Sequence, residues 1–310
     1  MSAHAKPITH IALIGPGLVG TAVLRQLTAS PSLASRFCIV AIANSKLMAL
    51  GTTLSPESGL PLTQANAQPG FSASADLYNA IRASARAPTG TAAPSAGTAG
   101  LVYHESTVGA GLPLLSTISD LMRTGDDIVA LKACSFARGN DTFSAIVAKA
   151  KSLGYTEPDP REDCNGQDVG RKVLILARAA GVPANLFSLA TLPIHNLVPE
   201  PLRALASADE FMRALPAFDD QFTQLNAKAK ANGAVLRYVG FVDVKANKAG
   251  VELREVALDH PLAGLRGADN LVRIVTRRFP NGIVVQGAGA GDEVTAFGVV
   301  ADLERVHWQQ

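Results

Sequence analysis

Three features of the sequence predict an α/β fold. Near the N-terminus, the apolar run of residues 11–14 leads into three glycines and then into a stretch with apolar residues on one helical face. This order is typical of a strand, a tight turn and a helix that bind a dinucleotide. From residue 101 onward helices and strands follow one another, whereas residues 84–100 are a low-complexity linker with nothing to bury. We therefore expect a truncated Rossmann-like nucleotide-binding domain and a second, α+β domain.

The composition favours a globular protein that binds small molecules. The chain has 310 residues, of which 47% are hydrophobic and 17% charged, enough for one large or two modest domains. A net charge of +2 without a block of basic residues argues against nucleic acid or an anionic membrane as a partner. No apolar stretch is long enough to span a bilayer.

Cysteine usage indicates a reducing compartment. The three cysteines have unrelated spacings and form no CxxC pair, and the first ten residues lack the apolar core of a secretory signal. We therefore expect a cytoplasmic protein. Cys164 has no adjacent histidine to make it a thiolate, so we expect it to be a packing residue and not a nucleophile.

The N-terminal glycines have distinct expected roles. Gly15 permits a tight turn, Gly17 lets the backbone approach a pyrophosphate, and Gly20 lets the helix lie close to the strand. The alternative is a structural turn without a ligand. The expected cofactor-binding residues are Gly15, Pro16, Gly17, Leu18, Val19 and Gly20.

The second strand, Phe37–Ala43, favours NADP over NAD. It is followed by Asn44, Ser45 and Lys46, where an enzyme selective for NAD usually presents an acid to the ribose hydroxyls. No acid repels a 2′-phosphate there, and Lys46 could bind one. NADP is therefore favoured, with NAD left open.

A polar run between residues 151 and 172 has the character of an active site. Asp168 and Lys172 are four residues apart and share one face of a helix, while prolines on both sides of Asp159 hold the chain extended and direct Glu157 toward them. The alternative is an exposed helix with an ordinary ion pair worth roughly 0.3–0.5 kcal/mol.

The same run resembles the substrate loop and helix of homoserine dehydrogenases. It reads Gly-Tyr-Thr-Glu-Pro-Asp-Pro, then an acid, Asn-Gly and Asp-Val-Gly-Arg-Lys, and the resemblance extends over residues 9–44 and 101–302. By this resemblance the chain is identified as a member of the monofunctional homoserine dehydrogenases of the fungal type. In that family Glu157 and Asp168 would bind the ammonium and hydroxyl ends of the substrate, Tyr155 and Asp163 would shape the pocket, and Lys172 would handle the proton.

The resemblance also implies the reaction and the assembly. The reaction is the NAD(P)-dependent interconversion of L-homoserine and L-aspartate 4-semialdehyde on the route to threonine and methionine, and the assembly is a homodimer. Gly291, in a glycine turn between the last strand and the last helix, would lie near the nicotinamide. The dinucleotide-binding domain would comprise residues 1–104, with the linker 84–100 and the C-terminal helix 290–310 returning to it. Residues 105–289 would form the substrate-binding and dimerisation domain.

A glycine-rich turn in residues 101–113 resembles the segment that holds a monovalent cation, usually sodium, in that family. The positions correspond to Glu105, Val108, Ala110 and Leu112. Taken without the resemblance, the segment is a plain turn between a strand and a helix, because hard-cation sites usually contain several acids.

In the second domain we expect helices and strands in alternation, and we expect His260 to be structural. The helices are 114–123, 142–153 and a long stretch at 207–232; the strands are 127–133, 235–244, 251–258 and 271–276. A short helix is also expected at 76–83 in the first domain.

Three family motifs are absent from the sequence. They are the Asn-Thr-Ser turn, the Pro-Asn-Lys turn with its lysine, and the Ser-Gly-Thr-Leu turn. The alternatives are therefore a catalytically impaired homologue that binds nucleotide or another subunit, a binding module for a different ligand, and an incomplete version of a longer chain.

Overall fold

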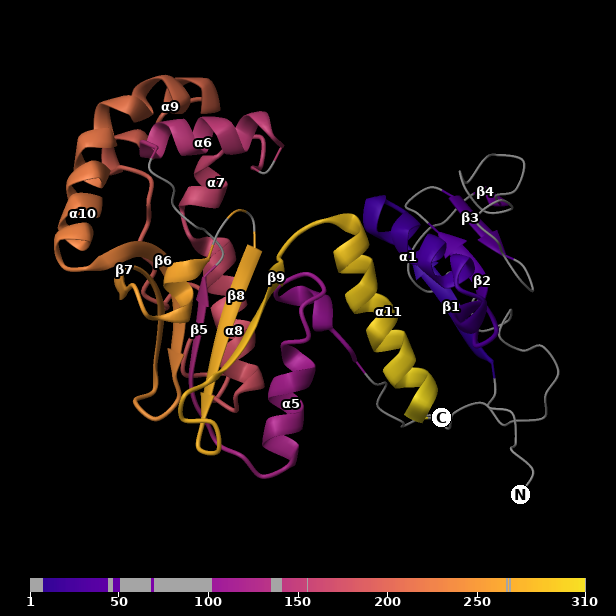
Figure 1. Ribbon diagram of the computed structural model, residues 1–310. Coiled ribbons are helices and arrows are strands. Elements are labelled where there is room, and N and C mark those ends of the chain that lie inside the picture. Colours follow the sequence, from indigo (N-terminus) through magenta and orange to yellow (C-terminus); the bar gives the residue numbers. More distant parts are fainter. Residues whose placement is uncertain are drawn as a thin grey trace. The chain divides into compact units, whose positions relative to one another are not determined.

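A computed structural model describes residues 8–43, 47–50, 68–69, 102–134, 141–154, 156–265, 267 and 269–309. The chain divides into two compact units (Figure 1). Unit 1 comprises residues 1–106 and 291–310, and unit 2 comprises residues 107–290.

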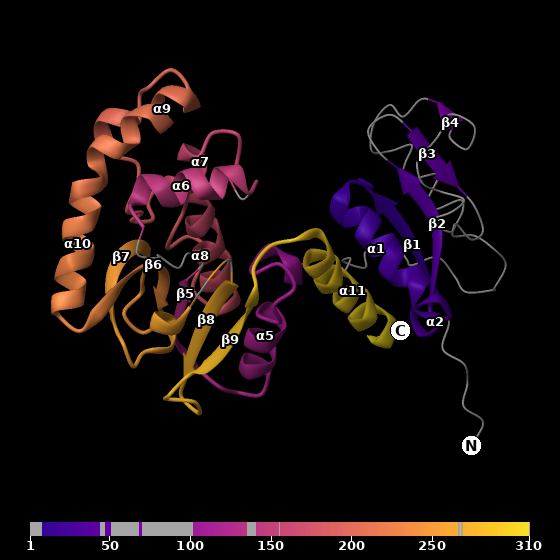
Figure 2. The same ribbon diagram turned by 45° about the horizontal axis from the view of Figure 1, so that its top comes forward.

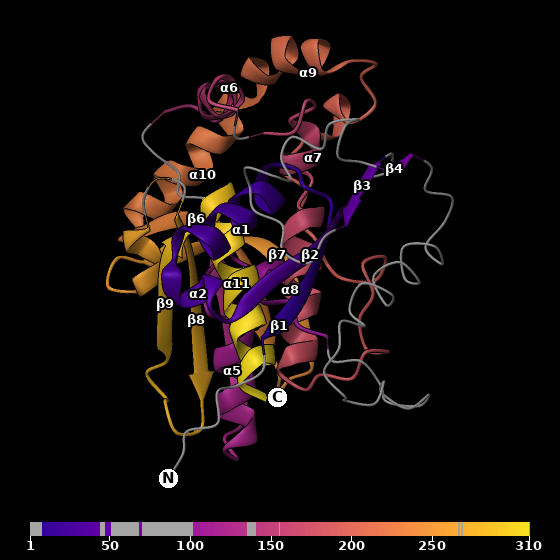
Figure 3. The ribbon, with the colours of Figure 1, turned by 90° about the vertical axis from the view of Figure 1, so that its right-hand side faces the viewer.

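Unit 1 is built on a sheet with the order β1-β2-β3-β4. Strands β1 (Thr9–Ile14) and β2 (Phe37–Ala43) are parallel and lie side by side (Figure 3), joined through α1 (Leu18–Ala29) and α2 (Pro31–Ala34). Strands β3 (Leu47–Leu50) and β4 (Gln68–Pro69) extend the sheet in antiparallel pairing (Figure 2).

The last helix, α11 (Asp292–Gln309), completes the core of unit 1. It packs against α1, and its Ala296 and Val300 belong to the same buried cluster as Leu24, Leu27 and Ile39. The cluster brings together both ends of the chain, since Thr9 Oγ1 lies 2.9 Å from His307 Nδ1 and both side chains are buried.

Unit 2 contains a five-stranded antiparallel sheet with the order β7-β6-β5-β8-β9. The inner strands β6 and β8 are mostly buried, whereas the edge strand β9 alternates partly exposed and exposed residues. The strands are β5 (Ile128–Cys134), β6 (Ala234–Asp243), β7 (Lys248–Ala257), β8 (Asp269–Thr276) and β9 (Ile283–Ala288).

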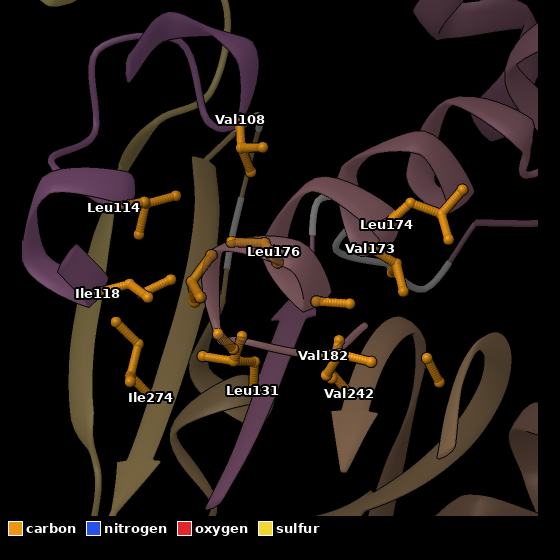
Figure 4. Close-up of a cluster of buried hydrophobic side chains, with 14 of the residues drawn as sticks. Val108, Leu114, Ile118, Leu131, Val173, Leu174, Leu176, Val182, Val242 and Ile274 are labelled. Atoms are coloured by element: carbon orange, nitrogen blue, oxygen red, sulfur yellow. The ribbon is translucent and has the colours of Figure 1, made fainter. Parts of the chain in front are cut away.

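Helices α5 (Leu115–Arg123) and α8 (Gln167–Ala179) pack on one face of this sheet. Figure 4 shows the buried side chains between these helices and the strands. Leu114, Ile118, Leu131, Val173 and Ile274 are buried in this layer, at 7% exposure or less. Fully burying such a side chain contributes about 1.5–3 kcal/mol, so this layer fixes α8 on the sheet.

A separate helical cluster in unit 2 holds the segment that precedes α8. Helices α6 (Phe143–Ser152), α7 (Arg161–Cys164), α9 (Ala208–Ala214) and α10 (Asp219–Ala231) enclose Phe143, Phe211 and Phe222. The rings of Phe143 and Phe222 stack with their centroids 4.2 Å apart. The buried side chain of Cys164 belongs to this cluster, so α7 is anchored immediately before α8.

The predicted α/β fold is confirmed, with three differences in detail. Residues 207–232 form two helices and not one, because the chain tightens into a 3-10 turn around Pro216, which cannot continue an α-helix. Residues 102–104 are not a strand. Strand β3 was not predicted, because its four residues follow β2 after only three positions and carry no alternating pattern.

Two further expectations lie outside the described residues: the helix at 76–83 and the linker at 84–100. Among the described helices, none combines the length and the apolar character that crossing a membrane requires.

Candidate active site

Helix α8 carries the two residues of the predicted i,i+4 pair. Lys172 Nζ lies 2.7 Å from Asp168 Oδ2, with 30% and 59% of the two side chains exposed. An exposed pair of this kind contributes well under 1 kcal/mol to stability. Its value is positional, since it holds an amine and a carboxylate together at the start of a helix.

The start of α8 is fixed by a turn that requires glycine. Asn165 Oδ1 accepts a hydrogen bond of 2.8 Å from the backbone N–H of Gln167, and Gly166 has φ +79°. A Cβ on Gly166 would overlap the hydroxyl of Tyr238, which donates to the carbonyl of His195 at 2.6 Å. The turn therefore sits directly against the sheet.

Two further glycines bring α8 close to its neighbours. A Cβ at Gly170 would lie 2.6 Å from Ile194 Cδ1, and a Cβ at Gly240 on β6 would lie 2.6 Å from Val173 Cγ2. Contacts this short do not occur in a packed interior, so both positions exclude larger residues.

Asp163 links the preceding loop to this helix. Its Oδ2 accepts a hydrogen bond of 2.9 Å from the backbone N–H of Glu157. Partial burial raises the pKa of Asp163, and the nearby carboxylate of Asp168 raises it further. Two carboxylates and one ammonium therefore gather at the N-terminal end of α8.

Glu157 itself is joined to this group only through its backbone. Its side chain is exposed and makes no hydrogen bond or ion pair with the residues that the structure describes. Tyr155, the other predicted pocket residue, lies outside them. Cys164 is buried, and burial raises the pKa of its thiol to about 12, which agrees with a packing role.

Lys172 also borders a small cavity of about 20 Å³, which has room for about one water molecule. The cavity lies between α8, the sheet and the turn at Val108 and Gly109. The other lining residues are Ala133, Cys134, Val169, Val173, Asn270, Leu271 and Val272.

Asn270 lines the same cavity as Lys172, and the sequence did not single it out. It is the second residue of β8, two residues before Val272, so a polar side chain occurs at a position whose spacing predicts the buried face. That spacing was the available signal.

In unit 1, the turn predicted to bind a nucleotide is a tight glycine turn that leads into α1. Gly15 has φ +86°, and a Cβ at Gly20 would lie 2.6 Å from the Gly15 carbonyl oxygen. No side chain caps the N-terminus of α1, and no acid lies in its first turn. Its first backbone N–H groups are therefore open to an anion.

The other residues predicted around the cofactor are placed in part. Leu18 is 80% exposed in the first turn of α1. Gly291 has φ +117°, and its carbonyl accepts hydrogen bonds from Thr295 in the first turn of α11. Asn44, Ser45 and Lys46 lie outside the described residues.

The segment predicted to bind a cation offers some of its predicted oxygen ligands, whereas others already have partners. The backbone carbonyl oxygens of Val108 and Ala110 accept no hydrogen bond within the described chain, whereas that of Leu112 accepts one of 2.8 Å from Leu114. The buried carboxylate of Glu105 lies 3.0 Å from the guanidinium of Arg305, which already neutralises it. No group of three or more His, Cys, Asp or Glu side chains suited to a metal is found in the described ranges.

The sequence matches known proteins over most of its length. The family model for homoserine dehydrogenase matches residues 113–303. The homoserine dehydrogenase of Paracoccidioides brasiliensis is 47% identical over 235 residues, which are 69% of this chain and 63% of that protein. That of Emericella nidulans is 40% identical over 306 residues, which are 93% of this chain and 76% of that protein. The chain thus spans less than two thirds of the Paracoccidioides relative.

Solved structures show the same fold. A Candida auris protein of unknown function, 34% identical, superposes with a TM-score of 0.85 over 98% of this chain and 99% of that one. A hyperthermophilic archaeal homoserine dehydrogenase in complex with NADPH, 19% identical, has a TM-score of 0.66 over 98% of this chain and 99% of that one.

The packing at Gly166 leads to a stability prediction. We expect Gly166→Ala to lower the free energy of unfolding by about 1–3 kcal/mol more than Gly233→Ala, because only the first adds an overlap to the backbone strain. Gly233 is the matched control, since it has φ +65° and open space around its Cβ position. Urea unfolding measures both; equal losses would contradict the close packing of the turn.

The raised pKa of Asp163 leads to a pH prediction. Ionising a group with a raised pKa costs folding free energy, and that cost disappears as the pH falls through the folded-state pKa. Asp163→Asn keeps an oxygen for the Glu157 N–H but cannot ionise. We therefore expect the unfolding temperature of the parent protein to rise relative to that of this variant as the pH is lowered from 7 to 4.

The control for this pH series is Asp120→Asn at an exposed position on α5. The account of Asp163 fails if the difference between the parent and Asp163→Asn stays constant, or moves in the variant's favour, as the pH is lowered.

Proposed function

Since this chain belongs to the homoserine dehydrogenase family, we propose that it interconverts L-homoserine and L-aspartate 4-semialdehyde with a nicotinamide cofactor. The observation that carries the proposal is the ion pair of Lys172 and Asp168 beside a cavity, at the place where the sequence resembles the family's substrate helix. The family is one of oxidoreductases that act on a CH–OH group.

The residues at the start of α8 suit a small amino acid that carries an alcohol or an aldehyde. Asp168 and Glu157 supply carboxylates for its ammonium and hydroxyl ends, and Asp163 and Tyr155 shape the pocket. Lys172 acts on the oxygen, because an amine can take the hydroxyl proton during oxidation and return it during reduction.

NADP is the proposed cofactor, held by Gly15, Gly17, Gly20 and the first turn of α1. The absence of Cβ atoms at the turn and the open N–H groups of an uncapped helix support a bound pyrophosphate. When bound, the nicotinamide accepts or donates the hydride. The preference over NAD rests on the lack of an acid at residues 44–46.

A monovalent cation, sodium, is proposed at the turn of Val108 and Ala110. The two carbonyl oxygens that accept no hydrogen bond from a described residue support it, whereas the pairing of Glu105 with Arg305 leaves that carboxylate little charge to offer. The fit is therefore to backbone oxygens, which a hard cation accepts. Unchanged turnover after replacement of sodium by choline would rule this site out.

We also propose a homodimer in a reducing, cytoplasmic compartment. The three cysteines have unrelated spacings and form no CxxC pair, which fits that compartment. The proposal of a homodimer rests on the resemblance to a family whose members form dimers. A monomer mass in sedimentation equilibrium would contradict it.

The direct test is an assay of NADP reduction by L-homoserine with the full chain. We expect turnover that depends on homoserine, with a lower Michaelis constant for NADP than for NAD. Nucleotide binding without turnover at any homoserine concentration would contradict the proposed activity, and a clear preference for NAD would contradict the choice of cofactor.

Replacement of Lys172 tests its role in proton transfer. We expect Lys172→Met to lower kcat by about 10²–10⁴-fold, the usual contribution of a positioned acid or base. The control is Lys228→Met on α10, whose side chain belongs to no part of the proposed site. If steady-state kinetics give Lys172→Met the kcat of the parent, Lys172 does not transfer the proton.

A further inference from the structure

Asn270 stands apart from the other buried polar side chains. It is 9% exposed, and its amide makes no hydrogen bond with any described residue. The remaining buried polar side chains all have partners: Thr9 with His307, Asp126 with Thr276, Glu105 with Arg305, and Arg237 with backbone carbonyls. The amide atoms of Asn270 are not among the fully buried atoms that lack a partner, so the amide is accessible to a water molecule or a small ligand.

The position of Asn270 is set by backbone pairing and by a glycine. Its backbone is paired with Gly287 of β9. A Cβ at Gly289 would overlap the Asn270 amide group, so the amide lies directly against the backbone of residue 289. Packing, and not hydrogen bonding, therefore holds this side chain in place.

The amide belongs to the same cavity wall as Lys172. Among the described residues that line this cavity, Asn270 and Lys172 carry the side chains with hydrogen-bonding nitrogens, and the others are apolar, Cys134 and Gly109 included. An amide NH₂ group offers two donors, and a lysine offers donors or, when neutral, one basic lone pair. The cavity has room for about one oxygen atom of the size of a water molecule, and both side chains line it.

We propose that the Asn270 amide donates a hydrogen bond to the substrate oxygen that exchanges its proton with Lys172. This inference rests on the proposed function. During oxidation of homoserine the C4–H bond breaks with its electron pair going to the nicotinamide, the O–H proton goes to the Lys172 amine, and the C=O bond forms. The amide stabilises the negative charge that develops on this oxygen after its proton has left and before the C=O bond is complete.

Asn270→Ala tests the hydrogen bond. We expect kcat/KM for homoserine to fall about 100-fold, the usual cost of one donor to a developing oxyanion. The dissociation constant for NADP should stay unchanged, because Asn270 is not part of the Gly15–Gly20 turn that is proposed to hold the pyrophosphate. The rise in unfolding temperature that homoserine produces in the presence of NADP should also be reduced.

Asn270→Asp separates a chemical role from a structural one. The carboxylate keeps the shape of the amide but loses the donors, and its charge stabilises the ammonium form of Lys172. We expect a loss of kcat/KM similar to that of the alanine variant together with a shift of the pH profile of kcat to higher pH. A structural role alone would leave that profile in place.

Asn232→Ala is the control, since this exposed amide bonds Glu255 and lines no part of the cavity. Folded Asn270→Ala and Asn270→Asp proteins with the parent's kcat/KM would overturn the inference while leaving the proposed function intact. Absence of homoserine turnover in the parent would overturn both. If neither Asn270 variant folds, the amide is a structural group and the inference falls.

Discussion

The arrangement of the proposed substrate-binding residues depends on how closely α8 approaches the sheet. Gly170 and Gly240 remove the side chains that would separate the helix from Ile194 and β6, and Gly166 turns the chain into the helix against Tyr238. Once α8 is seated by Val173 and the surrounding core, the i,i+4 spacing places Asp168 and Lys172 on one face of its first two turns. The same seating makes Lys172 and Asn270 walls of one cavity.

The part of this site that is local in sequence could be predicted from it. The Asp168–Lys172 pair follows from helical spacing, and the strand, glycines and helix of residues 9–29 follow from a short-range pattern. Asn270 could not be assigned a role in the same way. Its burial depends on the pairing of β8 with β9 and on Gly289, neither of which a local pattern reveals.

Long-range pairing also explains why Glu105, predicted as a cation ligand, forms an ion pair with Arg305 in the structure. The sequence offers it as an acid beside a glycine turn, and the fold pairs it with Arg305, far along the chain on α11. Its backbone N–H donates to Asp302 on the same helix at 2.8 Å. The C-terminal helix thus supplies both part of the core of unit 1 and the partners of a buried acid, so the two ends of the chain stabilise one unit.

Isotope transfer from the substrate tests the central claim most directly. Homoserine that carries two deuterium atoms at C4 would be incubated with the full chain and NADP, and the mass of the reduced nucleotide would be measured by mass spectrometry. The account predicts NADPH that is heavier by one deuterium, with the other retained in the aldehyde. Unlabelled NADPH, or no reduced nucleotide at all, would contradict hydride exchange at this carbon.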